Sequence, residues 1–282
     1  MATEATRDYA ERTARNAGLL TGAEQERLRA TRFVIAGCGS TGGAVLAPLA
    51  RSGARRFVLF DPGTYELNNL NRQDAYRSDL GRNKAEVQAE RLRAIDPFCE
   101  VEVHAEGAIP AALGGILRDG DLVIDAVDVT TSAGLEAKRA LHEAACARRL
   151  PVVTAYDIAT TQFVDLFDYR TSRIPFDGRV SARMDGDAFL RALIPPTALP
   201  PRIFRVLLGR KKDPSRPFPQ LAMTSALLGG LIVPYVLRVL SGAAIRRPLR
   251  VDLDELVQPR SGALMQRVRV LAGLPALWWR MR

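Results

Sequence analysis

Three glycines, Gly37, Gly39 and Gly42, form the pattern G-x-G-x-x-G directly after the apolar run RFVIA. Glycines at this spacing let the backbone approach a phosphate closely, and the start of the helix that follows favours negative charge. Asp61 ends the next apolar run, nineteen residues after Gly42. A carboxylate there can accept hydrogen bonds from both hydroxyls of a ribose. These residues predict a binding site for an adenosine nucleotide, and they fit NAD and ATP equally well.

The polar loop LNNLNRQ, residues 67–73, and the positions that follow it favour ATP over NAD. ATP carries a triphosphate whose charge must be neutralised, and whose metal ion needs a carboxylate, before its α-phosphorus can be attacked. Arg72 lies in this loop, and Lys84 begins the next helical segment. Two aspartates, Asp125 and Asp128, end a later apolar run. Any one of the four could be an ordinary salt-bridge partner, but together they predict a site for a triphosphate and its magnesium ion.

The elements that must position these residues alternate between short apolar strands and helical segments. Such alternation is typical of a parallel sheet whose strands are joined by right-handed helical crossovers. Strands are expected at 32–36, 57–60, 99–104, 121–125 and 151–155, and helices after 43 and near 84–95, 108–118 and 131–149. The sequence therefore predicts an α/β fold with a doubly wound, mostly parallel, Rossmann-like sheet, which brings the predicted site residues to one edge.

Three segments are expected in the chain. Residues 1–30 form an N-terminal helical arm, residues 31–170 form the nucleotide-binding α/β domain, and residues 171–282 form an irregular crossover segment and a C-terminal helical, basic part that packs on the same domain. The apolar run at 221–237 is at the short limit for crossing a bilayer and is interrupted by glycine and proline. It predicts a buried helix or one at a dimer interface, not a transmembrane span.

The net charge of +9 is carried by the last third of the chain. Residues 201–282 contain fifteen basic and four acidic side chains, whereas residues 1–30 contain five of each and residues 31–200 contain twenty and twenty-two. A basic segment of this kind could be a solvated face, or it could bind nucleic acid, an acidic peptide or a membrane surface.

Cysteine and histidine offer no second kind of chemistry. The three cysteines, Cys38, Cys99 and Cys146, are odd in number and widely spaced, which suits reduced thiols in a cytoplasmic protein. The N-terminus lacks the apolar core of a secretion signal, which agrees with that location. His104 and His142 each stand alone on a regular element, and we interpret both as structural residues.

Four motifs together resemble the ThiF/MoeB/HesA superfamily, the ubiquitin-activating-enzyme-like adenylyltransferases. The resemblance covers about residues 10–170 and returns weakly at 221–242, and its most specific part is the N-L-x-R-Q element. It implies a doubly wound sheet that forms a homodimer, and an ATP- and magnesium-dependent activation of a carboxylate as an acyl adenylate. The motifs are GCGSTGG at 37–43, D-x-G-x-x-x-L-N-N-L-N-R-Q at 61–73, GRNK at 81–84 and DLVIDAVD at 121–128.

The resemblance also implies roles for individual residues. Asp61 would bind the ribose, and Lys84 would stabilise the α- and β-phosphates. Asp128 would hold the magnesium ion. An arginine of the N-terminal arm, Arg15 or less favourably Arg12, would reach the triphosphate of the partner subunit. The nucleotide and its phosphates would further contact Asn69, Arg72 and Gln73.

This sequence departs from the family pattern in several places. Asp61 is followed by Pro62 and Gly63, where many members have a second acid two residues on, and Val129 replaces the asparagine that commonly follows the metal aspartate. It has no zinc-binding cysteine pairs, so no structural zinc is expected. No cysteine follows Cys146, so the chain lacks the crossover cysteine, expected within about 170–222, through which some members form a thioester.

The sequence therefore predicts an ATP-dependent adenylyltransferase. It would activate a substrate carboxylate with release of pyrophosphate and pass the acyl group to an amine, hydroxyl or thiol without an enzyme thioester. The acid could be a peptide, the C-terminus of a small carrier protein or a small free acid. Two alternatives remain open: a transfer-RNA-modifying dehydratase or cyclase of the cysteine-less type, and an NAD(P)-dependent oxidoreductase.

Overall fold

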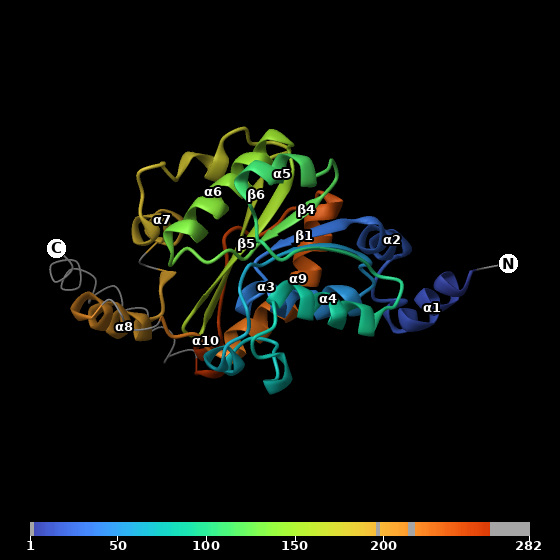
Figure 1. The fold of residues 1–282 in the computed structure, drawn as a ribbon, viewed down its shortest axis with the longest axis horizontal. Helices are drawn as coiled ribbons and strands as arrows, with labels where there is room; N and C mark the ends of the chain where they lie inside the picture. Colours follow the sequence, from blue (N-terminus) through green and yellow to red (C-terminus); the bar gives the residue numbers. More distant parts are fainter. Residues whose placement is uncertain (1–2, 196–197, 214–217, 260–282) are drawn as a thin grey trace.

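Apolar runs form the central strands of a seven-stranded sheet (Figure 1). The computed structural model describes residues 3–259 apart from 196–197 and 214–217. The strand order is β3-β2-β1-β4-β5-β6-β7, in which the first five strands are parallel and the last two are antiparallel additions. This order confirms the doubly wound, mostly parallel sheet. The strands are β1 (Arg32–Ala36), β2 (Arg56–Phe60), β3 (Glu100–His104), β4 (Leu122–Asp125), β5 (Pro151–Ile158), β6 (Thr161–Asp168) and β7 (Leu249–Asp252).

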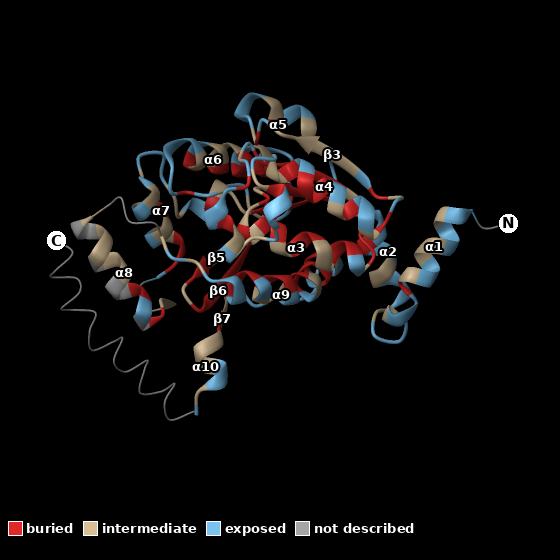
Figure 2. Cartoon of the chain, turned by 60° about the horizontal axis from the view of Figure 1, so that its bottom comes forward, coloured by how far each residue is buried: buried red, intermediate tan, exposed pale blue. Residues whose placement is uncertain are grey.

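Successive residues of β1 enter two different hydrophobic cores, because side chains alternate across a strand. Phe33 and Ile35 pack under one layer of helices, whereas Val34 and Ala36 pack under the other. Figure 2 shows the buried residues concentrated in the sheet and on the inner faces of its helices. The first layer comprises α2 (Gly22–Ala30), α3 (Ser40–Arg51), α4 (Lys84–Ile95) and α9 (Ala222–Ser241), and the second comprises α5 (Pro110–Ile116) and α6 (Ser132–Ala147).

The sequence predicts an irregular segment after residue 170, and the structure differs from this expectation. After a 3-10 turn at Pro175–Gly178, the segment forms α7 (Gly186–Leu193) and α8 (Pro201–Lys212). Asp185 caps α7 by accepting a hydrogen bond from the backbone N–H of Ala188, and α7 buries apolar side chains in the second core. Pro200 is the N-cap of α8 and Pro201 is its first residue, positions where proline is tolerated. A short α10 (Leu253–Val257) follows β7, and the basic C-terminal extension beyond residue 259 lies outside the described residues.

The apolar helix α9 lies against α3 within the same chain. A Cβ atom placed on Gly229 would lie 2.8 Å from the carbonyl oxygen of Ala44, so Gly229 serves a close helix–helix approach. Gly230 has open space beside it. By length and composition α9 could span a membrane, but half of its apolar window is buried inside the protein. A core helix of this kind passes the same test, so α9 gives no indication of a membrane span.

The N-terminal arm, α1 (Glu4–Arg12) and a 3-10 turn at Ala14–Asn16, lies at the end of the molecule opposite α7 and α8 (Figure 1). Arg12 anchors it, since its guanidinium donates to the carbonyl oxygen of Ala50 at 2.7 Å and pairs with Asp96 at 2.5 Å. Both contacts lie within the chain's own domain.

Candidate active site

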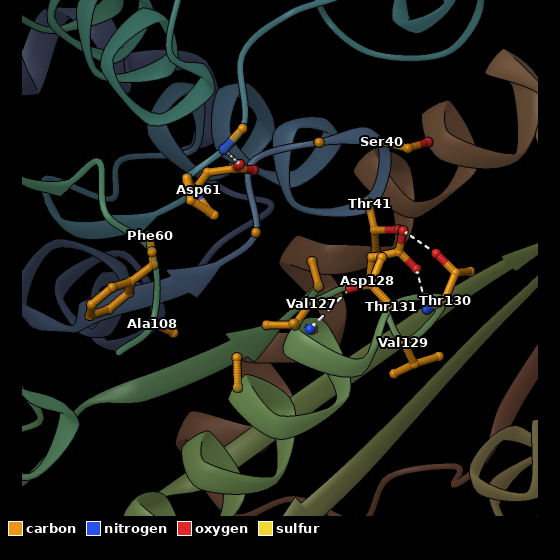
Figure 3. A pocket seen from close by; sticks show the side chains of 18 of the residues that line it. Ser40, Thr41, Phe60, Asp61, Ala108, Val127, Asp128, Val129, Thr130 and Thr131 are labelled. Atoms are coloured by element: carbon orange, nitrogen blue, oxygen red, sulfur yellow. Dashed lines mark hydrogen bonds between the residues drawn. The ribbon is translucent and has the colours of Figure 1, made fainter. Parts of the chain in front are cut away.

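A cavity of about 780 Å³ opens at the carboxyl edge of β1, β2, β4 and β5. This edge is where open α/β sheets bind ligands, because the loops of neighbouring strands meet there. Figure 3 shows part of its lining. Most of the residues predicted from the sequence line this one cavity. They are Gly37, Gly39, Asp61, Asn69, Arg72, Gln73, Lys84 and Asp128.

The glycine turn before α3 needs glycine for two physical reasons. Gly37 has a φ of +90°, and a Cβ there would lie 2.5 Å from the carbonyl oxygen of Ala126. A Cβ on Gly42 would lie 1.7 Å from the carbonyl oxygen of Gly37. Gly42 therefore packs α3 against the turn and is not among the cavity-lining residues. Gly39, the N-cap of α3, provides no side-chain cap, so the first N–H groups of the helix are available to an anion.

Asp61 is held at the end of β2 by two backbone N–H groups. Its Oδ2 accepts a hydrogen bond from Cys38 at 2.7 Å, and its Oδ1 accepts one from Gly63 at 2.8 Å. Each carboxylate oxygen keeps a second lone-pair site that a ribose hydroxyl could use. Gly63, two residues after Asp61, thus supports this carboxylate through a backbone group.

The polar loop after β2 uses part of its polarity to hold itself together. Asn69 is buried and its side chain accepts a hydrogen bond from the backbone N–H of Glu66. Arg72 donates from Nε to Gln220 Oε1 at 2.7 Å and from Nη1 to the carbonyl oxygen of Asn68 at 2.9 Å. These contacts fix the guanidinium at the cavity wall. The side-chain oxygen of Gln73 is buried there without a hydrogen-bond partner among the described residues.

Lys84 places a second cation on the wall beside Asp61. A Cβ built on Gly63 would lie 3.4 Å from Lys84 Nζ and 3.1 Å from Asp61 Oδ1, so the two side chains flank the same point. The ammonium lies 5.9 Å from the centre of the Tyr65 ring. Within the described part of the chain it makes no hydrogen bond, which leaves its donors available to a ligand. Two cations at the edge of one cavity favour a triphosphate over NAD.

Asp128 lies on the exposed loop after β4. Its Oδ1 accepts from the backbone N–H of Thr130 and its Oδ2 from the Thr130 hydroxyl, each at 2.9 Å (Figure 3). The remaining lone pairs can bind a cation. Among the described residues no three His, Cys, Asp or Glu side chains are grouped to hold a metal ion. Asp128 would therefore hold magnesium together with phosphate oxygens, a common arrangement for this ion.

Asp125 does not share this role, although the sequence places it at the same edge. Its side chain is fully buried, 2.5 Å from Lys138 Nζ and 2.9 Å from His142 Nε2. Burial alone would raise the pKa of Asp125, but Lys138 and His142 reverse this and hold that pKa well below its usual range. The Asp125 carboxylate also accepts from the backbone N–H of Val127, and Lys138 donates to the carbonyl oxygen of Val127. The buried pair thus fixes the loop that carries Asp128.

Several side chains around the site were not predicted from the sequence. The burial of Lys138 could have been suspected from the sequence, because this lysine lies between Leu135 and Leu141 on one face of its helix. The carboxylate of Asp157 on β5 gave no such signal, because the hydroxyls that surround it come from distant parts of the chain. They belong to Ser40 and Ser225.

The burial of the thiols supports the interpretation that no cysteine is a nucleophile. All three cysteines are buried. Burial raises the pKa of the Cys38 thiol well above its usual value and raises that of Cys99 to about 12. A buried neutral thiol is a poor nucleophile. His142 agrees with its structural interpretation as well, since it is buried between Asp125 and the hydroxyl of Tyr169.

Neither arm arginine lines the cavity of its own chain. Arg12 is engaged by Asp96 and by the backbone of Ala50. Arg15 is exposed in the 3-10 turn that follows α1. Of the two, Arg15 has the side chain that is free to reach another molecule.

The glycine turn, the carboxylate of Asp61 and the two cations at the edge of a doubly wound sheet define a nucleotide-binding protein of the Rossmann-like class. A sequence profile of the ThiF family matches residues 12–258. The chain belongs to the ThiF family.

Curated relatives align with parts of the chain. The uncharacterised protein MT1398 of Mycobacterium tuberculosis is 35% identical over 58% of this chain and 22% of its own length. The tRNA threonylcarbamoyladenosine dehydratase of Haemophilus influenzae is 38% identical over 39% of this chain and 43% of its own length. The sulfur carrier protein adenylyltransferase of Thermus thermophilus is 37% identical over 37% of this chain and 39% of its own length. The chain thus spans less than half the length of each of these relatives.

Solved structures share the fold over most of the chain. The structure of PaaA superposes with a TM-score of 0.65 at 20% identity, covering 90% of this chain and 74% of PaaA. The Escherichia coli tRNA N6-threonylcarbamoyladenosine dehydratase TcdA, in complex with ATP, superposes with a TM-score of 0.57 at 23% identity, covering 86% and 97%. At these identities the likeness establishes the fold.

Proposed function

We propose that this protein uses ATP to adenylate a substrate carboxylate. The observation that carries the proposal is the joint placement of Asp61, Arg72, Lys84 and Asp128 on the wall of one cavity. A ribose ligand, two cations and a metal carboxylate are the groups that such a reaction needs. The relative named sulfur carrier protein adenylyltransferase supports this chemistry. The acid would be a peptide, a carrier-protein C-terminus or a small acid.

The chain's own groups account for the steps of adenylation. The free N–H groups at the start of α3 and the Lys84 ammonium receive the phosphates, and Arg72 counters the charge that develops as pyrophosphate leaves. The substrate carboxylate attacks the α-phosphorus in line, forming an oxygen–phosphorus bond while the bond to pyrophosphate breaks. Magnesium, when bound, would neutralise phosphate charge, and Asp128 is the residue placed to hold it.

The test is exchange of labelled pyrophosphate into ATP in the presence of candidate acids, together with hydroxylamine trapping of the acyl adenylate. The trapped hydroxamate identifies the acid directly. We expect exchange that depends on one class of acid. Absence of ATP binding by calorimetry would refute the proposal.

A second candidate is modification of transfer RNA. It rests on the relative named tRNA threonylcarbamoyladenosine dehydratase and on the fifteen basic side chains of residues 201–282. Phosphate contacts make RNA binding steeply salt-dependent. Salt-dependent retention of transfer RNA, with adenylation only when that RNA is present, would favour this candidate.

In either case we infer a cytoplasmic enzyme, because its three thiols are buried and unpaired.

The first prediction concerns the metal. Asp128→Asn should keep one contact with Thr130, in which the amide oxygen accepts from the backbone N–H, and its amide nitrogen can donate to the Thr130 hydroxyl. The variant loses the charge that attracts magnesium. We expect nucleotide binding without metal to be retained and magnesium-dependent adenylation to fall by about two orders of magnitude or more. Calorimetry with and without magnesium and pyrophosphate exchange measure the two quantities. A variant with normal magnesium-dependent turnover would show that Asp128 is not the metal ligand.

The second prediction concerns a site shared between two subunits. We propose a homodimer in which the exposed Arg15 reaches the triphosphate of the partner, since this arginine does not line its own cavity. Arg15→Ala and Lys84→Ala should each be inactive alone. Mixed, they should recover part of the activity, because one hybrid site in the heterodimer contains both cations.

Subunit exchange and assembly need their own measurements. Arg12→Ala is the matched control, since it removes an arm arginine that is bound within its own chain. Arg12→Ala should lower the free energy of unfolding. Because it keeps both Arg15 and Lys84, mixing it with Lys84→Ala should not raise the activity above that of Arg12→Ala alone. A monomer by light scattering, or an inactive mixture despite demonstrated exchange, would contradict the shared site.

A further inference from the structure

A buried carboxylate that the adenylation step does not use lines the same cavity. Asp157 on β5 is 6% exposed and lies next to the first residue of α3. Its Oδ2 accepts hydrogen bonds from Ser40 at 3.0 Å and from Ser225 of α9 at 2.8 Å. Its Oδ1 is buried and has no hydrogen-bond partner among the described residues, since the side-chain amide of Gln162, its neighbour on β6, donates to the carbonyl oxygen of Phe163 instead. The lining of the cavity therefore includes a carboxyl group with one buried oxygen that lacks a donor.

The environment of the Asp157 carboxylate destabilises the folded state. A buried acceptor without a donor loses its hydrogen bonds to water without replacement, so it lowers the stability of the fold. Burial raises the pKa of Asp157, and the two serines, Gln162 and Arg72 oppose that shift. Groups that destabilise a fold in this way are typical of functional sites, where a ligand completes them.

ATP does not supply the missing donor. Its triphosphate offers oxygen acceptors. Its donors are the ribose hydroxyls and the amino group of adenine, and both belong to the adenosine end of the nucleotide, which Asp61 holds at the end of β2 in the proposed site. Three strand spacings separate β2 from β5 in the order β2-β1-β4-β5, which is about 14 Å across the sheet. The donor must therefore come from another molecule that binds in the cavity near Asp157. Arg72 lies near enough to Asp157 to lower the pKa of that carboxyl, so this molecule would bind beside the phosphates.

We propose that Asp157 binds the nitrogen atom of a primary amine that takes the acyl group from the adenylate, and that it accepts the proton this nitrogen loses. The inference rests on the proposed adenylation and names the class of molecule that accepts the acyl group. The neutral amine attacks the acyl carbon, a nitrogen–carbon bond forms, and the carbon–oxygen bond to AMP breaks. AMP leaves as an anion, and Asp157 Oδ1 receives the proton.

The chemistry of Asp157 selects an amine over a hydroxyl. Attack by an amine creates a positively charged nitrogen, whose proton is acidic enough for a carboxylate to remove. A hydroxyl has to be deprotonated by a stronger base, for which histidine is the usual choice. No histidine lines the cavity among the described residues.

The test separates the two half-reactions in Asp157→Asn. With the acid identified by hydroxylamine trapping, pyrophosphate exchange reports adenylation, and amide formation with a panel of primary amines that includes glycinamide reports transfer. We expect amide formation to fall about 100-fold or more, the usual effect of losing a general base. Pyrophosphate exchange should fall far less. Transfer to hydroxylamine should also be largely kept, because hydroxylamine is far less basic than an ordinary primary amine and attacks adenylates without help from a base on the enzyme.

Controls exclude a structural explanation. Ser225→Ala removes one hydroxyl from Asp157 but keeps the carboxylate, so its amide formation should stay within about tenfold of the wild type. Asp157→Asn should unfold at the same temperature as the wild type or higher, since it removes a buried charge.

The outcomes are distinguishable. A wild-type enzyme that exchanges no pyrophosphate with any acid overturns the proposed function and this inference with it. If the wild type exchanges pyrophosphate but forms an amide with no amine of the panel, or if Asp157→Asn loses both half-reactions equally, only the amine site is overturned.

Discussion

Arg72→Ala is expected to slow pyrophosphate exchange by about two orders of magnitude or more, the usual loss when a charge-stabilising group is removed from a transition state. The Arg72 guanidinium is held at the cavity wall by Gln220 and by the carbonyl oxygen of Asn68. Alanine would leave the developing charge on pyrophosphate without this cation. The rate should fall much more than the affinity for ATP, because the interaction strengthens as the α-phosphorus is attacked.

Two further variants sharpen this prediction. Arg72→Lys keeps the charge but not the planar fork that binds Gln220 and the phosphate together, so it should recover part of the rate. Gln220→Ala keeps the guanidinium and removes its anchor at 2.7 Å, so it should have a smaller effect. Near-normal exchange in Arg72→Ala, with an unchanged melting temperature, would refute the phosphate role of this residue.

Lys138→Met is expected to lower the free energy of unfolding by about 3–5 kcal/mol, because it leaves the buried Asp125 carboxylate without its cation. The two groups lie 2.5 Å apart and both are fully buried. Methionine approximates the length of the lysine stem, so lost packing contributes little. Denaturant unfolding measures the change.

A double variant tests whether charge is the cause. Lys138→Met with Asp125→Asn removes both charges and should restore much of the stability. An equal loss in the single and double variants would contradict the ion-pair explanation and point to packing.

The pH dependence has a definite sign. In the wild type the pKa of Asp125 is held below its unfolded value by Lys138 and His142 despite burial, so its contribution to stability is present above the unfolded pKa and is lost as the pH falls through the folded one. In Lys138→Met burial without the cation should raise that pKa. The deficit should therefore be greatest at neutral pH and should shrink as the solution is acidified. A deficit that does not change with pH would argue against a charged Asp125.

The sequence alone determined the fold class and most of the nucleotide site. Parallel strands end at one edge of a sheet, so residues that follow them, such as Asp61, Arg72 and Asp128, must meet there once the alternation of strands and helices is recognised. The glycine turn was predictable for a similar reason, since Gly37 and Gly42 occupy positions where a side chain would collide with backbone.

The strand pattern alone did not decide which of two aspartates faces the cavity, and the assignment of Asp128 came from the family resemblance; the tertiary structure shows the reason. Asp125 is the last residue of β4, and its side chain turns into the core beneath α6, whereas Asp128 lies on the loop beyond the strand. Side chains alternate across a strand, so moving the predicted end of β4 by one residue would move each of its side chains to the opposite face of the sheet. Composition does not define the end of a strand to within one residue.

The tertiary structure also assembled the polar groups that local patterns could not reveal. Asp157 meets Ser225 across 68 residues, and Ser40 meets Ser225 across 185. The separate segments carry no shared periodicity, because their proximity is created by the packing of α9 on α3 and β5. Burial and the lack of a donor at Asp157 are properties of that packing, and they exist only once the chain has folded.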